Sequence, residues 1–388
     1  MANAALRGKP DAGNPHVRFD EGEVASCTEE ASLRRVPCRR QPEGSASGCA
    51  ATPRRGSLLY KGTQGKGLAL GRREFLNGAL FATLAATSGC SQDDGATHGG
   101  GKGATGYSLN ASGNLCITVP GVREGVRVFH VTDTHLPLHD SRDDAYAGNY
   151  ARMSHGGASR EVFSQILAKA KAAKADLVAL TGDIISFPTL ANVEFVAEEL
   201  RKSGLDWIYT AGNHDWHFEG VPGSDAAQRE EWIPKRILPL YCGDVDPFAH
   251  SKVVKGIRFV AIDNSIYHVT ERQLSFWRSE IAKGDPTVLL MHIPLWMDGF
   301  DIDTCGNPNW GAATDRFWEI ERREKWAERQ SAESFALRSE VLAASNLVAV
   351  LTGHIHRWLS ASKDGRLMFA APHGKDGFAC DVRIVPAF

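Results

Sequence analysis

The chain has 388 residues, with 44 Lys and Arg against 46 Asp and Glu, and its formal net charge is -2 at pH 7. Hydrophobic residues make up 43% and charged residues 23%, which is typical of a soluble globular protein and excludes a chain that is basic throughout. The charge is distributed unevenly. Residues 1–90 contain 13 Lys and Arg against 8 Asp and Glu, whereas the remaining residues contain 31 against 38. The two parts therefore carry net charges of opposite sign, +5 and -7, and need separate explanations.

Residues 1–70 are rich in Arg, Pro, Gly, Ser and Ala and show no sustained helical or strand periodicity. Such a segment cannot bury enough apolar surface to offset the entropy lost on ordering it. We therefore expect residues 1–70 to be a disordered N-terminal extension.

An arginine pair precedes an uncharged, Ala- and Gly-rich run within residues 71–90. Arg72 and Arg73, followed by the uncharged run Phe75–Cys90, resemble a twin-arginine export signal. The run is shorter than the ~20 apolar residues that a membrane span needs. A short buried helix is the alternative, which the low-complexity flanks disfavour. The resemblance implies recognition by the twin-arginine export machinery and an extracytoplasmic location. Such signals normally lie near the initiator, so we expect translation to begin nearer Leu58–Leu68, with the extension not translated.

The end of this run resembles a lipoprotein processing site. Gly89 and Cys90 match the lipobox, although Thr87 stands where Leu is usual. We therefore expect a lipid anchor at Cys90, and a mature protein that is periplasmic or membrane-anchored by lipid. Residues 91–120 contain seven glycines and are expected to form a flexible linker to a catalytic domain at 121–388.

Strand-like and helical patterns alternate in this last region. Apolar runs typical of buried strands occur at Val126–Thr132, Leu177–Thr181, Trp207–Thr210, Ile257–Ile262, Val288–Met291 and Leu347–Thr352. Helical patterns occupy Ser159–Ala175, Leu190–Ser203, Thr270–Lys283 and Thr314–Ala344. Short apolar strands that alternate with helices predict an α/β domain with a largely buried sheet, and Gly365 marks a closing hairpin.

Five of these runs end in short clusters of Asp, Asn and His, where the ligands of such sheets gather. The clusters are Asp133-Thr134-His135, Gly182-Asp183, Gly212-Asn213-His214-Asp215, His292 and Gly353-His354-Ile355-His356. Side chains two residues apart point the same way on an extended strand, which would bring Asp133 and His135 together. Carboxylate, imidazole and amide groups in one site favour Mn, Fe or Zn over an all-oxygen Mg or Ca cage.

In this order the clusters resemble the DxH, GDxx, GNH(D/E), lone His and GHxH motifs of the calcineurin-like metallophosphoesterases. The resemblance runs from about Arg127 to the end of the chain. It implies an αββα sandwich, with the metal site at the carboxyl ends of the strands. It also implies two divalent or trivalent metal ions. The first would be bound by Asp133, His135 and His356, and the second by Asn213, His292 and His354. Asp183 would bridge the two ions.

The chemistry implied is hydrolysis of a small phosphoester by attack of a metal-bridging hydroxide. His214 would then protonate the leaving oxygen or stabilise the transition state, and Asp215 would orient His214. Two alternatives stay open, a cyclic-nucleotide or other nucleotide phosphodiesterase and a non-catalytic exported metal-binding protein. A net charge of -7 without a basic stripe argues against long nucleic acids as partners.

Two subgroups of the family are disfavoured. Purple acid phosphatases have an iron-binding Tyr three residues after the second motif's Asp, where this chain has Ser186. Serine/threonine protein phosphatases carry GDxVDRG, which Gly182–Pro188 does not match. The cyclic-nucleotide phosphodiesterases often have an acidic residue at this position, so the sequence does not single them out.

Substrate contacts are expected from insertions around the metals. His139–Gly157 carries Arg142 and Arg152, which can meet a phosphate. Leu295–Glu340 carries several Trp and Arg residues, although an amphipathic helix packed on the body is the favoured interpretation there. Arg357, next to the last motif, is the third candidate phosphate contact.

Overall fold

The computed structural model describes residues 96–98, 105–110, 113–151, 156–218, 220–222, 225–297 and 331–387. All of them belong to one compact unit of the chain. The predictions for the N-terminal extension, the export signal, Cys90 and Arg152 lie outside the described residues, as does most of Leu295–Glu340.

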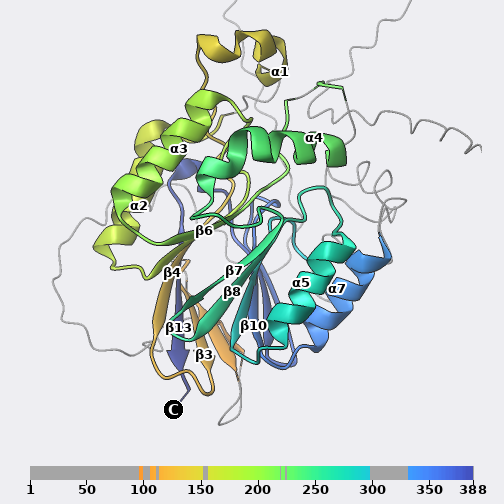
Figure 1. Cartoon of the computed structure of the whole chain (residues 1–388). Coiled ribbons are helices and arrows are strands. Elements are labelled where there is room, and N and C mark those ends of the chain that lie inside the picture. Colours follow the sequence, from red (N-terminus) through yellow and green to blue (C-terminus); the bar gives the residue numbers. More distant parts are fainter. Residues whose placement is uncertain are drawn as a thin grey trace, which may run out of the picture. The chain divides into compact units, whose positions relative to one another are not determined.

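The described strands form two sheets (Figure 1). The first sheet has the order β1-β2-β3-β13-β4-β5-β6, with β1 Ala96–His98, β2 Gly106–Leu109, β3 Leu115–Val119, β4 Val126–Val131, β5 Leu177–Thr181, β6 Trp207–Thr210 and β13 Cys380–Pro386. The second has the order β11-β12-β10-β9-β8-β7, with β7 Ala249–Val254, β8 Ile257–Ile262, β9 Thr287–Leu290, β10 Leu347–Thr352, β11 Leu359–Lys363 and β12 Arg366–Ala370. Strands β4, β5 and β6 are mutually parallel, as are β8, β9, β10 and β12.

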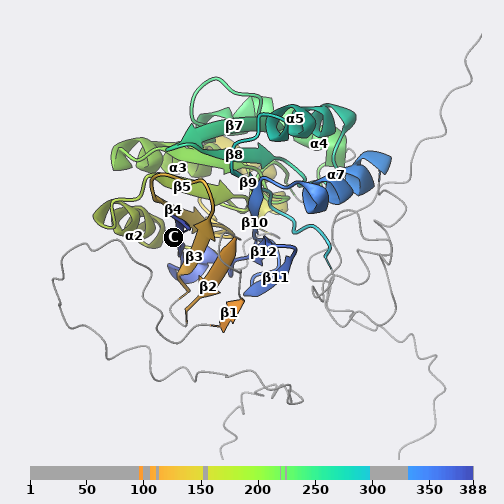
Figure 2. The ribbon, with the colours of Figure 1, turned by 90° about the horizontal axis from the view of Figure 1, so that it is seen from below.

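Helices cover the outer face of each sheet, as Figures 1 and 2 show. The described helices are η1 Ser141–Tyr146, α1 Ala147–Tyr150, α2 Arg160–Ala172, α3 Leu190–Ser203, α4 Asp225–Trp232, η2 Ile233–Ile237, η3 Leu238–Leu240, α5 Glu271–Ile281, α7 Ala332–Ala343 and η4 Gly374–Asp376. Capping residues determine where these helices begin and end. Thr189 caps α3 by accepting from Asn192 N, and Gly204 ends it in the left-handed conformation. Thr270 and Gln273 form a capping box at the start of α5.

Three clusters of buried side chains among the described residues define the layers. One lies between the sheets, where Val128 of β4 and Leu290 of β9 belong to the same cluster. Phe129 belongs instead to a second cluster with Phe163 of α2, because neighbouring residues of a strand face opposite ways. The third joins Leu289 of β9 to α5 and α7. The fold is therefore the expected αββα sandwich.

The apolar runs predicted the central strands and helices well, and the hairpin expected at Gly365 is formed by β11 and β12. Other strands were missed. β2 and β3 lie in the segment expected to be a linker, so the first sheet begins before residue 121. In β3, Leu115, Ile117 and Val119 are buried and alternate with half-buried residues, a pattern too short to stand out. β13 lies between β3 and β4, and it pairs residues remote in sequence, such as Cys380 with His130 and Val382 with Leu115.

A helix is expected at Thr314–Ala344, and the structure describes this segment only from Ser331 onward. There Ser331 caps α7, which begins at Ala332. None of the helices in the described part of the chain has the length and apolarity that a membrane crossing needs.

Candidate metal centre

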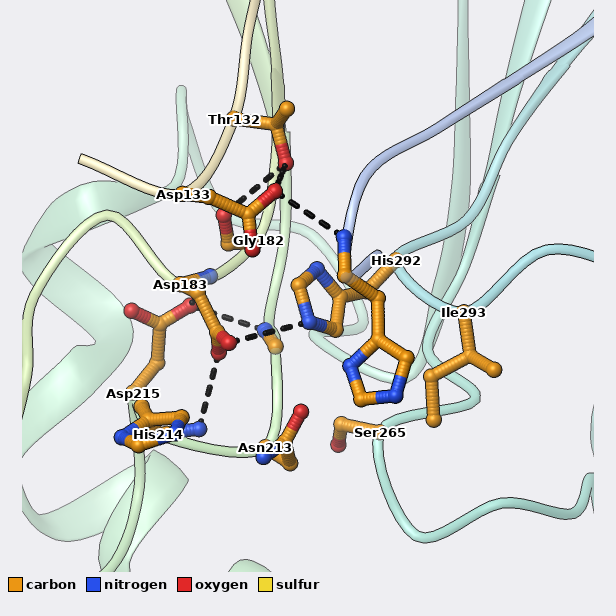
Figure 3. Close-up of polar contacts among 12 residues, drawn as sticks. Thr132, Asp133, Gly182, Asp183, Asn213, His214, Asp215, Ser265, His292 and Ile293 are labelled. Atoms are coloured by element: carbon orange, nitrogen blue, oxygen red, sulfur yellow. Dashed lines mark hydrogen bonds and ion pairs between the residues drawn. The ribbon is translucent and has the colours of Figure 1, made fainter. Parts of the chain in front are cut away.

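The polar clusters that follow β4, β5, β6, β9 and β10 meet at one edge of the sandwich (Figure 3). Three groups of side chains there bring their ligand atoms within 4.8 Å of one another. The groups are Asp133, His135 and His356; His135, Asp183 and His214; and Asp183, His292 and His354. The structure thus brings six of the seven predicted ligands together in these groups, including His135 and His356, which are 221 residues apart in sequence.

The first group surrounds one oxygen of Asp133. His356 Nε2 lies 3.2 Å and His135 Nε2 lies 3.8 Å from Asp133 Oδ1. The two imidazole nitrogens are themselves 3.1 Å apart. Asp133 Oδ2 points the other way and accepts from His354 N at 2.9 Å and from Thr132 Oγ1 at 2.7 Å. One carboxylate oxygen is therefore held by the chain while the other faces the imidazoles.

The two carboxylate oxygens of Asp183 also have different partners. Asp183 Oδ1 accepts from His214 N at 2.8 Å, while Asp183 Oδ2 lies 3.1 Å from His292 Nε2 and 3.8 Å from His135 Nε2. His292 Nδ1 donates to Thr181 O at 2.8 Å, so its other nitrogen is directed at Asp183. Asp183 is the member that the second and third groups share, the position expected of a bridging ligand.

Backbone conformation brings these residues together in a way the strand periodicity did not predict. Asp133, His135, Asp183, His354 and His356 all have φ between 48° and 68°, in the left-handed region. The expectation that Asp133 and His135 converge because the chain is extended is therefore wrong. A left-handed residue that is not glycine costs of order 1–3 kcal/mol, and such residues cluster at functional sites.

Two glycines are required by close packing. A Cβ on Gly353 would lie 1.9 Å from Thr132 Oγ1 and 2.2 Å from Asp133 Oδ2. A Cβ on Gly212 would lie 2.2 Å from Asp183 Oδ1. Each glycine thus lets a neighbouring loop reach a carboxylate that is a candidate ligand.

Asp215 fastens two motif loops to each other. Its carboxylate accepts from the backbone N–H of Asp183 at 2.9 Å, of Gly212 at 2.8 Å and of Ile185 at 3.0 Å. Burial raises the pKa of Asp215 to about 7, and the charge of Asp183 adds to that effect. These contacts hold the loops in place, and the orientation of the His214 imidazole by Asp215 stays a prediction.

The charges of the site are balanced between buried carboxylates and imidazoles. Burial alone would raise the pKa of Asp183, but His292 and His214 outweigh it and hold that pKa well below its usual range. Burial alone would lower the pKa of His292, but Asp183 raises it to about 9. Burial, reinforced by His214, lowers the pKa of His135 to about 3. Two cations would replace the proton that the carboxylates now hold on His292.

Exposure differs between the two halves of the site. The side chains of His356 and His135 are 39% and 13% exposed, whereas His292 is fully buried and Asp183 is 1% exposed. His214 is 8% exposed, and its ring meets that of His135 edge to face at 4.7 Å. The centre is therefore more open to solvent on the side of His356 and His135.

The three arginines expected to bind substrate differ in their surroundings. Arg142 donates to both carboxylate oxygens of Glu194 at 2.7 Å and also to Asp140, so a phosphate would have to displace two carboxylates. Arg357 is half-buried and directly follows His356. Arg152 lies outside the described residues.

Two further residues support the site: Thr132, which the sequence did not single out, and His217, whose place beside the third motif suggested a structural role or a substrate contact. Thr132 donates to Asp133 Oδ2, and His217 Nδ1 donates to Asn213 O at 2.6 Å. Both are buried. Their proximity in sequence to the motifs was a signal for a supporting role, but the direction of each hydrogen bond needed the structure.

The donor set fits two first-row metal ions. Asn213 Oδ1 is buried and, among the described residues, accepts no hydrogen bond. Leaving a buried amide oxygen unsatisfied costs about 1–3 kcal/mol, a cost that coordination to a cation removes. Asp133, His135 and His356 would hold one ion, and Asn213, His292 and His354 the other, with Asp183 between them.

Gly353→Ala should weaken metal binding about 10- to 100-fold, because its methyl group would displace the Asp133 carboxylate. Metal content after dialysis against limiting Mn measures the effect. Gly148→Ala is the matched control, since a Cβ there meets nothing within 4 Å. Equal metal content in the two variants would contradict the assignment of Asp133.

Metal binding should release a proton from His292 between pH 7 and 9. Its pKa of about 9 means that it is protonated in the metal-free protein at pH 7, and a bound cation requires the neutral ring. The apparent affinity for Mn should therefore rise about tenfold per pH unit up to about pH 9. Calorimetry in two buffers of different ionisation enthalpy measures the released proton.

His250→Gln is the control for this titration, because burial lowers the pKa of His250 to about 4 and it is outside the three groups. This variant should release the same number of protons as the wild-type protein. A binding heat that does not change with the buffer would refute the prediction.

Comparison with known proteins places this centre in a family. The family described as calcineurin-like phosphoesterase matches residues 126–358. A protein from Psychrobacter arcticus named as a probable cyclic nucleotide phosphodiesterase is 21% identical over 285 residues, which cover 68% of this chain and 88% of that protein.

The chain is also similar to two solved structures that are phosphatases by name. A dimetal phosphatase from Danio rerio is 12% identical, with a TM-score of 0.40. The match covers 64% of this chain and 87% of the phosphatase chain. A purple acid phosphatase from yellow lupin seeds is 13% identical and has a TM-score of 0.41, covering 70% of this chain and 49% of its own. The family match itself spans more than half of the chain and includes all seven expected ligands, so this chain belongs to the calcineurin-like phosphoesterase family.

Proposed function

We propose that this protein is a dinuclear metal-dependent phosphodiesterase. The observation that carries the proposal is the convergence of six of the seven candidate ligands, with Asn213 beside them (Figure 3) and its Oδ1 buried and unsatisfied among the described residues. When bound, two cations of the Mn, Fe or Zn type supply an activated water and neutralise the phosphoryl oxygens.

The chain's own residues have separate tasks in this reaction. The N–H of His214 holds the Asp183 carboxylate, and the Asp215 carboxylate holds the backbone N–H of Asp183. The His214 imidazole lies beside His135 at the more exposed half of the centre, where a leaving group would depart. Its proposed role is to donate a proton to the leaving oxygen.

A diester substrate is favoured by one comparison. The relative from Psychrobacter arcticus is named as a probable cyclic nucleotide phosphodiesterase, and its match covers most of both chains. We therefore propose a small phosphodiester of the cyclic nucleotide class. A phosphomonoesterase and a non-catalytic metal-binding protein are the competing functions.

Turnover of bis-p-nitrophenyl phosphate and of p-nitrophenyl phosphate, with added Mn, separates these three functions. We expect hydrolysis of the diester and slower hydrolysis of the monoester. Hydrolysis of the monoester alone would support a phosphatase. No hydrolysis of either, in protein shown to contain two metal ions, would support a non-catalytic protein.

His214→Ala should keep both metal ions and lower turnover about 10²- to 10⁴-fold, because it removes only the proton donor. The measurements are the metal content and kcat, with His250→Gln as a matched histidine control outside the centre. Loss of a metal ion in His214→Ala would show that His214 is a ligand instead, as its place in one of the three groups would permit.

We also propose that the enzyme acts outside the cytoplasm, exported by the twin-arginine machinery and anchored by lipid at Cys90. The support is the arginine pair and the lipobox-like Gly89-Cys90 in the sequence. Palmitate labelling of cells that express the full chain should label the wild-type protein and not Cys90→Ser. Labelling that survives this substitution would overturn the lipid anchor.

A further inference from the structure

Strand β8 is a central parallel strand of the second sheet, next to β9, yet none of the five motifs follows it. The turn Asp263–Tyr267 occupies its carboxyl end. All five residues of this turn are at most 3% exposed, although three of them are polar. Buried polar side chains of this kind require hydrogen-bond partners, and the partners show what the turn supports.

Asn264 holds the chain next to His292. Its Nδ2 donates to Ile293 O at 2.7 Å, and its Oδ1 accepts from Ile293 N at 3.1 Å. Both hydrogen bonds of one amide thus fall on one backbone residue, directly after the candidate ligand. This pair fixes the position of His292 along its strand end.

Ser265 holds the loop that carries Asn213. Its Oγ accepts from Trp216 Nε1 at 2.8 Å and donates to Asp263 Oδ1 at 2.5 Å. Trp216 directly follows the Gly212–Asp215 motif and is 1% exposed. Figure 3 draws Ser265 and Ile293 together with Asn213 and His292.

Tyr267 meets the imidazole of His354. Its OH lies 3.3 Å from His354 Nε2, and the two rings meet edge to face at 5.5 Å. Tyr267 has a φ of 67°, which is costly for a bulky residue, and its N–H closes the turn by donating to Asn264 O at 2.8 Å. A ligating histidine commonly engages an outer partner through its other ring nitrogen, so with Tyr267 at Nε2 the Nδ1 atom of His354 would face a bound cation.

We propose that the Asp263–Tyr267 turn is the outer shell of the second metal ion, with Tyr267 as a positioning residue for His354. The inference rests on the proposed two-metal function. Its basis is that the turn supports the Asn213 loop, His292 and His354, the three ligands that belong to the second ion and not to the first. Removing one of these supports should therefore weaken the second ion selectively.

Tyr267→Phe tests the proposal in the full-length protein, because it keeps the ring and removes the hydroxyl. Titration with Mn, followed by calorimetry and electron paramagnetic resonance, should show the second Mn bound about 10- to 100-fold more weakly and the first unchanged. At two equivalents of Mn, the wild-type protein should give the spectrum of a coupled pair. Tyr267→Phe should give the signal of isolated Mn until excess Mn restores coupling and kcat.

Tyr241→Phe is the matched control, since Tyr241 is also buried and its hydroxyl has no hydrogen-bond partner among the described residues. If Tyr267→Phe does not fold, Ser265→Ala tests the same support through Trp216. Unchanged affinity for both ions, or equal weakening of both, would overturn the outer-shell role. A wild-type protein that binds fewer than two Mn ions would instead overturn the two-metal function on which the inference rests.

Discussion

Hydrogen bonds from backbone N–H groups to buried carboxylates hold the whole centre together. Asp133, at the end of β4 in the first sheet, accepts from His354 N, at the end of β10 in the second. Asp183 and Asp215 join the loops after β5 and β6 in the same way. Because a charged acceptor makes a stronger hydrogen bond than a neutral one, these contacts can keep several left-handed residues in place. The metal centre therefore depends on how the two sheets are joined at this edge.

The same carboxylates explain the electrostatics of the site. A buried carboxylate is unfavourable unless it is paired, and here the partners are imidazoles whose pKa values are displaced in opposite directions. His292 gains a proton beside Asp183, whereas His135 loses its proton to burial and to neighbouring imidazoles. Bound metal ions would take the place of the proton that Asp183 holds on His292. The supporting residues, including the turn after β8, then decide how firmly each ligand is held.

The central strands and most helices could be predicted because each is a short apolar run with its own capping signals. The meeting of most candidate ligands at one edge could be predicted because each motif lies within a few residues of a strand end. β13 could not, since its place between β3 and β4 depends on pairing across the length of the domain. Arg142 could not be judged either, because its pairing with Glu194 joins residues 52 positions apart.

The sequence by itself determined the chemical identity of the centre: which carboxylates, imidazoles and amide are present, and on which strand ends. Local patterns suffice for this because ligand type and strand propensity are properties of short segments. Only the tertiary structure decided that Asp215 binds backbone groups and that the centre is exposed at His356 and buried at His292. It also brought Tyr267 to His354. Such contacts depend on distances between segments remote in the chain, which the packing of the two sheets sets.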